Sequence, residues 1–565
     1  MYSALKKRFP GIHYGLVSGV CALILSLIGM VETFNQRGII SEVISMGQML
    51  LLLVVALFAY TGASRFKQTG RIAVTGLMTG IVSALLLSLL VVIGQVVNLR
   101  QVFINASPSL FHSLLFQQES RTAGILLILL SGGLTGVLAG LLNLVPSRLR
   151  SVMLTASGVI IAFGLLQDTL SPVLSQWGFL SILNDLLFAG NGLTISGAIV
   201  LFLFAAALKY LWSSKGPAVS AQVRALPAGS RKKLNIVLFI AGVLLLVVLP
   251  RVVGLFLSEV LVIIGLYVML GFGLNIIIGF SGMLDLGHVA YFAIGSYTVA
   301  ILTSAELGFF ALNFWQALPI AIGMGVLTGI LICTPVLKMR GDYLAITTLG
   351  FGEIIRLLVL SDFLKPYVGG AQGIGKIPKA AIGSFLFARP QELYYLVIAG
   401  CLLTGFIAWR VRESRLGRSW MAVREDEDVA QAMGINLVST KLKAFATGAG
   451  FSALSGAIFA TKLGSVYPHS FNVMISINIV CVIIVGGMGS LPGVIVGAAA
   501  LVGLPELLRE FAEYRLLVYG AVLVAMMLLR PAGLWPEKQR ARELQEAQVE
   551  HGVNEQAPAV AGSHH

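Results

Sequence analysis

Apolar runs long enough to cross a membrane recur along almost the whole chain, and short polar connections separate them. A helix needs about 20 apolar residues to span the hydrocarbon core of a bilayer, and tilting gives some latitude. Six runs precede Lys232, at residues 14–31, 43–61, 72–97, 123–144, 152–166 and 193–211. Ten more follow, at residues 234–249, 253–278, 289–302, 318–337, 343–360, 393–409, 444–463, 473–485, 494–508 and 516–529. The pattern predicts an all-α, polytopic transmembrane helical bundle of about sixteen spans, with some helices broken or re-entrant because runs such as 473–485 are short.

Lysine and arginine are distributed unequally between alternate connections of the N-terminal half. One side has only Arg37, Arg100 and Arg121, whereas the other has Lys6, Lys7, Arg8, Arg65, Lys67, Arg71, Arg148, Arg150, Lys215, Arg224, Arg231, Lys232 and Lys233. Cytoplasmic connections of membrane proteins carry the excess of positive charge, so the second side and the N-terminus are predicted to be cytoplasmic. Counting onward places Lys338 with Arg340, residues 410–443 and the C-terminus inside as well. The exception is the outer connection 361–392, which carries Lys365, Lys376, Lys379 and Arg389.

The basic segment 213–233 has the composition of a linker and separates two membrane domains. We predict a six-span extension at 1–212, whose role is not readable from its residues, and a second membrane domain at 234–536. The tail 537–565 is too polar to bury a core and is predicted to be a disordered cytoplasmic segment.

Composition narrows the function. Hydrophobic residues make up 57% of the 565 residues and charged residues 11%, whereas soluble proteins carry about 25% charged residues, so a soluble enzyme is excluded. The net charge of +14 follows the topology rather than forming a basic stripe, so no nucleic-acid partner is predicted. Cys21, Cys333, Cys401 and Cys481 lie in apolar runs without metal-ligand spacing. We therefore predict no catalytic residue, metal site or resident cofactor, and no enzymatic activity.

Residues 370–377, Gly-Ala-Gln-Gly-Ile-Gly-Lys-Ile, fit the first part of a phosphate-binding loop. Ile377 stands where such a loop needs a serine or threonine to bind Mg²⁺, and the segment is predicted to lie outside the cell. Nucleotide binding by this chain is therefore not expected.

Two glycine-rich stretches, 279–287 and 486–493, interrupt apolar runs. Irregular backbone at membrane depth is tolerated only where protein buries it or where it lines a watery cavity, so these breaks suggest a transport pathway. Asp285, His288, Asp342, Glu353 and Arg356 lie within or beside the spans, where ionisable groups are costly and often functional. Simpler roles are open too: a tight turn at 487–493, a helical ion pair between Glu353 and Arg356, an interface role for His288 and a capping role for Asp285.

The cytoplasmic connection 411–436 is long and patterned. Four acids at 425–428 precede a short helix-permissive run, and Gly434 follows it. Carboxylates favour a helix N-terminus and glycine favours its end, so a two-turn helix is predicted here. Such a helix can dock into a groove of another protein, and an ordinary solvated loop is the alternative.

Asp428-Val429-Ala430 followed by Gly434 resembles the E-A-A-x-x-x-G loop by which ABC importer permeases dock onto their ATPases, with aspartate in place of glutamate. Residues 253–535 resemble the LivM-type permeases of branched-chain amino acid ABC importers through several jointly specific motifs. These are GLN at 273–275, GFSGMLDLGH at 279–288, GDYLAITTLG at 341–350 with Glu353, GGAQGI at 369–374 and GGMGSLPG at 486–493.

The resemblance implies two groups of functional residues. Those of the ATPase-coupling loop are Glu425, Asp426, Asp428, Ala430 and Gly434. Candidates for the translocation pathway are Asn275, Ser281, Asp285, His288, Asp342, Tyr343, Thr347, Thr348 and Glu353.

The resemblance also implies an assembly in the prokaryotic inner (plasma) membrane, surrounded by lipid. Its members are a second permease or a second copy of this chain, two cytoplasmic ATPases that bind ATP and Mg²⁺, and an extracytoplasmic substrate-binding protein. The implied substrates are branched-chain amino acids or related small molecules such as other amino acids, amides or urea. The N-terminal half lacks these motifs and a second docking loop. A secondary transporter or channel that works without ATPases is the alternative.

Overall fold

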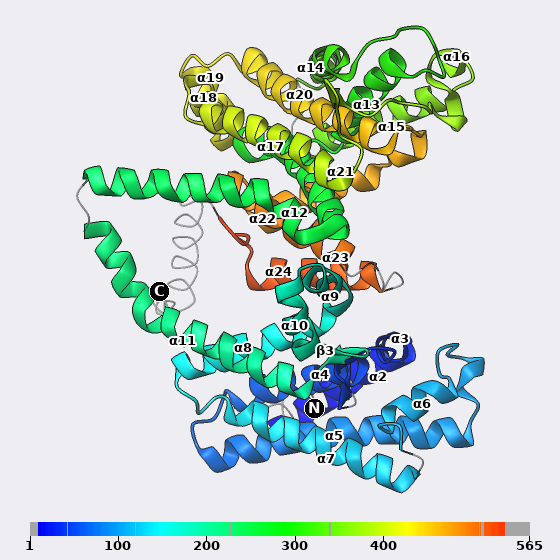
Figure 1. The fold of residues 1–565 in the computed structure, drawn as a ribbon, viewed down its shortest axis with the longest axis vertical. Helices are drawn as coiled ribbons and strands as arrows, with labels where there is room; N and C mark the ends of the chain where they lie inside the picture. The colour runs from blue at the N-terminus through cyan, green and yellow to red at the C-terminus, as the bar shows by residue number, and fades with distance from the viewer. Residues whose placement is uncertain are drawn as a thin grey trace, which may run out of the picture. The chain divides into compact units, whose positions relative to one another are not determined.

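The computed structural model describes residues 9–41, 43–118, 120–225, 228–337, 339, 341–507, 509 and 514–536. They form two compact units, unit 1 (Met1–Val243) and unit 2 (Leu244–His565), which are described separately (Figure 1). Of the segments discussed above, residues 6–8, Lys338, Arg340 and the tail 537–565 lie outside the described residues.

The prediction of an all-α membrane bundle is confirmed. Within the described residues, twelve helices are long and apolar enough to cross a membrane, and three shorter apolar helices accompany them at Val289–Thr303, Leu491–Leu507 and Tyr519–Leu528. The predicted runs 234–249 and 253–278 lie on either side of a kink in α12 (Ala228–Leu274), where Gly254 is non-helical (φ of 84°) and Pro250 is close by; the second run ends in the π-helical turn that follows α12. The long apolar helices are therefore fewer than the sixteen apolar runs.

Unit 1 contains the helices α2 (Pro10–Leu27), α3 (Met30–Phe34), α4 (Met46–Ala63), α5 (Thr69–Val96), α6 (Pro108–Leu114), α7 (Arg121–Leu141), α8 (Ser147–Leu165), α9 (Gln167–Ser175), α10 (Gly178–Leu187) and α11 (Ile195–Ala225), with a 3-10 turn at Leu99–Gln101. Four very short strands, β1 (Gly38–Ile40), β2 (Ile44–Ser45), β3 (Phe188–Ala189) and β4 (Gly192–Leu193), form a small sheet in the order β2-β1-β4-β3. The predicted linker 213–233 contains the end of α11 and the start of α12.

Glycines set the closest helix contact of unit 1. On α5, Gly76 and Gly80 lie against Gly136 and Gly132 of α7, and a Cβ added at Gly80 would lie 2.0 Å from the carbonyl oxygen of Gly132. Small residues four apart let membrane helices approach until their backbones touch, where dispersion replaces the missing hydrophobic driving force. The α5–α7 pair therefore depends on having no side chain at this crossing.

Unit 2 contains, after α12, a π-helical turn η2 (Asn275–Phe280) and the helices α13 (Val289–Thr303), α14 (Phe314–Val336), α15 (Asp342–Leu360), α16 (Lys365–Val368), α17 (Pro390–Arg412), α18 (Arg415–Glu425), α19 (Glu427–Ala432), α20 (Leu437–Leu463), α21 (Val473–Gly486), α22 (Leu491–Ala498), α23 (Leu504–Leu507) and α24 (Arg515–Leu529). The remaining short elements are η3 (Gly370–Gln372), β5 (Ala381–Ile382), β6 (Phe385–Leu386), η4 (Pro468–Ser470) and the π-helical turn η5 (Ala499–Gly503).

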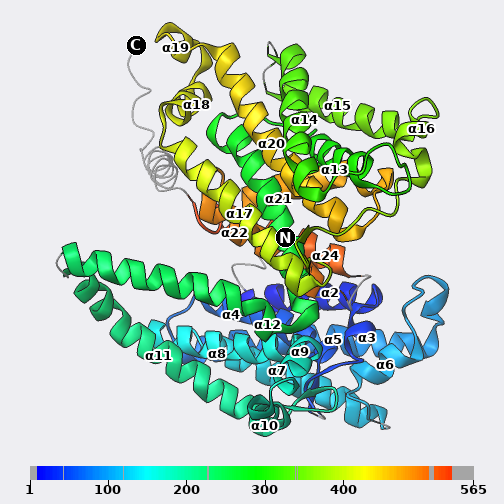
Figure 2. The ribbon, with the colours of Figure 1, turned by 45° about the horizontal axis from the view of Figure 1, so that its top comes forward.

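Helix α20 is the centre of unit 2, and α13 and α14 pack along it (Figures 1 and 2). Its membrane-spanning stretch is 83% buried inside the protein, more than that of any other candidate span in the described residues. Small polar side chains join it to its neighbours: Ser296 Oγ on α13 donates to the Gly456 carbonyl (2.8 Å), and Ser455 Oγ donates to the Leu266 carbonyl (3.0 Å). Such interhelical hydrogen bonds hold helices together where lipid surrounds the bundle.

The α5–α7 crossing gives a stability test. Replacing Gly80 with alanine pushes a methyl group into the Gly132 carbonyl, so the two helices must separate. We expect the free energy of unfolding to fall by about 1–3 kcal/mol. Gly158 on α8 is exposed and has no atom within 4 Å of an added Cβ, so Gly158→Ala is the matched control. Thermal unfolding of the full chain in detergent should show a lower midpoint for Gly80→Ala only. Equal midpoints would contradict the close crossing.

Candidate functional site

The first glycine-rich stretch is a genuine break between helices. After α12 the chain passes through the π-helical turn η2, and α13 does not begin until Val289. Gly282 has φ of 73°, a conformation that side chains disfavour, and the Ser281 hydroxyl donates to the Ile277 carbonyl (2.9 Å) at the end of the turn. The predicted interruption at 279–287 is therefore confirmed as a break in regular structure.

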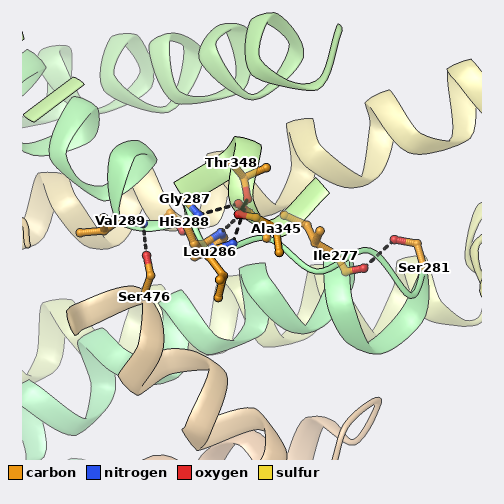
Figure 3. A network of polar contacts seen from close by, with 11 residues as sticks. Ile277, Ser281, Leu286, Gly287, His288, Val289, Ala345, Thr348 and Ser476 are labelled. Atoms are coloured by element: carbon orange, nitrogen blue, oxygen red, sulfur yellow. Dashed lines mark hydrogen bonds and ion pairs between the residues drawn. The ribbon is translucent and has the colours of Figure 1, made fainter. Parts of the chain in front are cut away.

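Side chains replace the helix hydrogen bonds that this break loses (Figure 3). The Leu286 amide donates to Thr348 Oγ1 (3.0 Å), the Gly287 amide to Asp285 Oδ1 (3.0 Å) and the Val289 amide to Ser476 Oγ (3.0 Å). These partners come from α15, from the break itself and from α21, so three parts of unit 2 meet at the start of α13. An unpaired buried amide is costly, which explains why polar side chains gather here.

Asp285 and His288 form a fully buried pair inside the break. His288 Nδ1 lies 3.2 Å from Asp285 Oδ2, and neither side chain is exposed to solvent. On its other side, His288 Nε2 is hydrogen-bonded to the hydroxyl of Ser452 in the middle of α20. Buried ionisable groups persist when they are paired and hydrogen-bonded, as these are. The triad ties the break to the central helix.

The second glycine-rich stretch meets the first. Helix α21 ends at Gly486, α22 begins at Leu491, and Gly487 and Gly489 have φ of 118° and 82°. The Gly489 amide donates to Asn275 Oδ1 (2.9 Å) in η2, so one buried side chain joins the two breaks. The nitrogen of the same side chain, Asn275 Nδ2, is buried and has no acceptor among the described residues.

The predicted pathway residues do not all come together. Asn275, Ser281, Asp285, His288 and Thr348 are buried around the two breaks. Asp342 and Tyr343 are exposed at the start of α15, and Thr347 donates to the Tyr343 carbonyl within the same helix (2.8 Å). Glu353 pairs with Arg356 one turn away, which is the helical ion pair that the sequence left open. In this structure the predicted pathway residues Asp342, Tyr343, Thr347 and Glu353 are thus separate from the buried network.

The connection 411–436 contains two short helices, α18 and α19 (Figure 2). Asp426 lies between them, and its Oδ1 accepts the amides of Asp428 (2.8 Å) and Val429 (2.9 Å) at the start of α19. Gly434 follows α19 with φ of 85°, as the sequence predicted for a helix end. Glu425 and Asp428 are exposed and Ala430 is buried against the protein, while Val429 and Met433 are 59% and 79% exposed. The element thus presents acidic and apolar side chains on a capped helix.

Three contacts fix this element to the membrane domain. Trp420 is completely buried, and its Nε1 donates to the Thr440 carbonyl at the start of α20 (2.9 Å). Lys441 of α20 is buried and forms an ion pair with Glu427 (2.8 Å). Arg424 Nη1 donates to the Gly279 carbonyl in η2 (2.7 Å), and a Cβ added at Gly282 would lie 2.9 Å from Arg424 Cγ. Helices α18 and α19 therefore touch both the central helix and the first break.

Sequence reasoning did not single out Arg424, Ser452 or Ser476. Serines are common in membrane helices, and the arginine stood among other charges that suited a cytoplasmic loop. No spacing rule marks a side chain whose partner is a carbonyl about 145 residues away, as the Gly279 carbonyl is from Arg424.

The segment resembling a phosphate-binding loop has another geometry. Gly370–Gln372 forms a 3-10 turn, and Ile374 then pairs with Val466 through two backbone hydrogen bonds (2.9 and 2.8 Å). The next helix, α17, begins only at Pro390. A phosphate loop needs a helix N-terminus directly after its glycines, and no helix begins within the described residues 373–389.

Comparison with known proteins identifies the family. Residues 256–528 match the family model of the branched-chain amino acid transport system permease component. The chain is 35% identical to the high-affinity branched-chain amino acid transport system permease protein LivM of Escherichia coli K12, over 73% of this chain and 95% of that protein. It is 38% identical to LivM of Salmonella typhimurium LT2, over 50% of this chain and 71% of that protein.

A second kind of permease is also similar. The high-affinity branched-chain amino acid transport system permease protein LivH of Escherichia coli K12 is 26% identical, over 47% of this chain and 90% of that protein. No solved structure matches the chain. The alignment with LivM of Escherichia coli includes more of this chain than unit 2 contains, so it extends into unit 1. With its array of membrane-spanning helices, the chain is an integral membrane protein that belongs to the LivM family of permeases of branched-chain amino acid transport systems.

Proposed function

We propose that this chain imports branched-chain amino acids as the permease subunit of an ATP-driven importer, with α18 and α19 receiving the movement of cytoplasmic ATPases. The observation that carries the proposal is the contact of Arg424 with Gly279, because it joins the cytoplasmic element directly to a helix break at membrane depth. The substrate class is taken from the names of the LivM and LivH relatives. Other amino acids, amides and urea are further candidates.

Partners follow from the same proposal. A LivH-like permease, or a second copy of this chain, supplies the other half of the pathway. Two ATPases bind ATP and Mg²⁺ on the cytoplasmic side, and a binding protein delivers substrate outside. The excess of lysine and arginine on one side supports cytoplasmic N- and C-termini in the plasma membrane.

The two joined breaks suit a pathway for an amino acid. Each break is followed by a helix N-terminus, at Val289 and at Leu491, and the partial positive charge there favours a carboxylate. Asn275 adds a buried amide N–H with no acceptor among the described residues. We infer that the ATPases move α18 and α19, that Arg424 passes this movement to η2, and that Trp420 and Glu427 pass it to α20.

The docking proposal predicts that charges on the exposed face of α19 release the ATPases. Val429→Asp combined with Met433→Asp places carboxylates on a face that we expect to be buried by the partner, so co-purification of the ATPases and ATP-driven leucine uptake should both be lost. Ile382→Asp, an exposed apolar residue of the outer loop, is the control. Uptake that persists without ATPases in proteoliposomes would favour a secondary transporter or channel.

The coupling proposal predicts a different defect at Arg424. A charge-assisted hydrogen bond is worth about 1.5–3 kcal/mol, so Arg424→Met should lower ATP-driven uptake about tenfold or more while the ATPases stay bound. Arg418 lies on the same helix and donates to the Glu413 carbonyl (3.1 Å) without reaching η2, so Arg418→Met is the matched control. Loss of ATPase binding in Arg424→Met, or an equal defect in Arg418→Met, would show that Arg424 does not transmit the movement.

A further inference from the structure

Helix α15 carries an ion pair in the middle of a membrane-spanning segment. At about 1.5 Å per residue, Glu353 lies about 16 Å from the Asp342 end of α15 and about 10 Å from its Leu360 end. Arg356 Nε lies 3.0 Å from each carboxylate oxygen of Glu353, so the two side chains are paired with each other. Even so, the Glu353 side chain is 36% exposed and the Arg356 side chain 28%. The rest of the described chain therefore leaves part of this pair uncovered.

Lipid does not suit this pair. Charged groups near the centre of a bilayer are costly, and in membrane proteins they almost always face the interior of a helix bundle or a watery cavity. The buried pair of Asp285 and His288 follows that rule. Helix α14 has the kind of exposed surface that lipid requires, because every exposed residue between 319 and 331 is apolar. The exposed side of α15 therefore needs a cover other than acyl chains.

The pair belongs to an open face of α15, formed by Ile346, Gly350, Glu353 and Leu357. These residues follow one another at intervals of three or four, so they lie on one side of the helix. Ile346 and Leu357 are 67% and 53% exposed, and a Cβ added at Gly350 would have no atom within 4 Å. The spanning stretch of α15 is 22% buried, against 83% for α20. A missing side chain between apolar neighbours lets a helix of another chain approach closely.

We propose that a second permease packs on the open face of α15 and covers the pair of Glu353 and Arg356. The inference rests on the proposed function, which requires that second permease. A LivH-like permease fits this surface better than a second copy of this chain. If α15 packed against α15 of an identical chain, the two Glu353 carboxylates would approach each other near the symmetry axis, and like charges across an interface are costly. A chain of different sequence need not place an acid there.

The same placement accounts for motif residues that lie apart from the helix breaks. Tyr343, which is 77% exposed, and Thr347 precede Gly350 at helical spacing and lie beside the open face of α15. On this proposal they belong to the contact between the two permeases, whereas the buried network around the breaks joins helices within this chain.

A side chain added at Gly350 tests the contact. Gly350→Leu points into open space in this chain, so the thermal unfolding midpoint of the chain purified alone should not fall. In the assembly the new side chain stands between α15 and the partner helix. We expect the amount of a co-expressed, affinity-tagged LivH-like permease that co-purifies to fall at least tenfold, and ATP-driven leucine uptake to fall with it. Gly323→Leu on α14 is the matched control, because Gly323 is exposed and also has no atom within 4 Å of an added Cβ.

Exchanging the two charges gives a second, independent variant. Glu353→Arg combined with Arg356→Glu keeps an ion pair within α15 and reverses the charges that face the partner. If the pair served only this chain, the exchange would leave co-purification unchanged. We expect a loss of at least tenfold, because the partner then meets each charge where the opposite one stood.

Three results would overturn the inference. If Gly350→Leu and the charge exchange both leave co-purification and uptake unchanged, the open face of α15 is not the contact, and the proposed function stands. If differently tagged copies of this chain co-purify and Gly350→Leu separates them, the face joins two identical chains instead. If the unaltered chain with its ATPases shows no ATP-driven uptake, the proposed function fails and this inference fails with it.

Discussion

A backbone N–H or C=O group inside a bilayer finds no water, so every interruption of a membrane helix must be given a protein partner. Unit 2 has two such interruptions, and they lie next to each other. The amides of Leu286, Gly287 and Val289 are taken by Thr348, Asp285 and Ser476. The amide of Gly489 and the carbonyl of Gly279 are taken by Asn275 and Arg424. The first break has partners on α15, α18, α20 and α21, and Asn275 joins the second break to the first, so a change of shape at the first break disturbs its contacts with these helices and with the second break.

Hydropathy predicted the helices well because a helix that lies in lipid must be apolar along its whole length, which makes it visible in the sequence. The predicted division near Pro250 and Gly254 is also present, because Gly254 has a non-helical conformation that separates two helical stretches within α12. The breaks at 279–287 and 486–493 were visible because several glycines stand close together there with polar residues or proline, whereas the glycines inside α5 and α7 are spaced along apolar sequence. The cap and end of α19 were also visible, since aspartate and glycine favour those positions for local reasons.

The partners of the breaks could not be predicted in the same way. Ser452 and Ser476 are ordinary residues of apolar helices until the fold brings them to His288 and Val289. Asp342, Tyr343 and Thr347 stand in a motif of the family, yet the structure leaves them apart from the buried network. In both cases the contacts join segments that are far apart in the sequence. A motif identifies one segment, whereas a hydrogen-bond network is built from several segments that only the fold brings together. The roles of these residues in transport stay predictions.

The last described segment of the chain closes the second break from outside its own hairpin. The amides of Leu534 and Trp535 donate to the carbonyls of Val485 (2.8 Å) and Gly486 (2.9 Å), and a Cβ added at Gly533 would lie 2.6 Å from Gly487 Cα. Residues 533–535 follow α24 (Arg515–Leu529) along the chain, so they reach these carbonyls only after α24 has brought the chain back to the end of α21. The hydrogen bonding of the second break is therefore completed by a segment beyond the last described helix, and its geometry depends on the placement of α24 as well as on its own glycines.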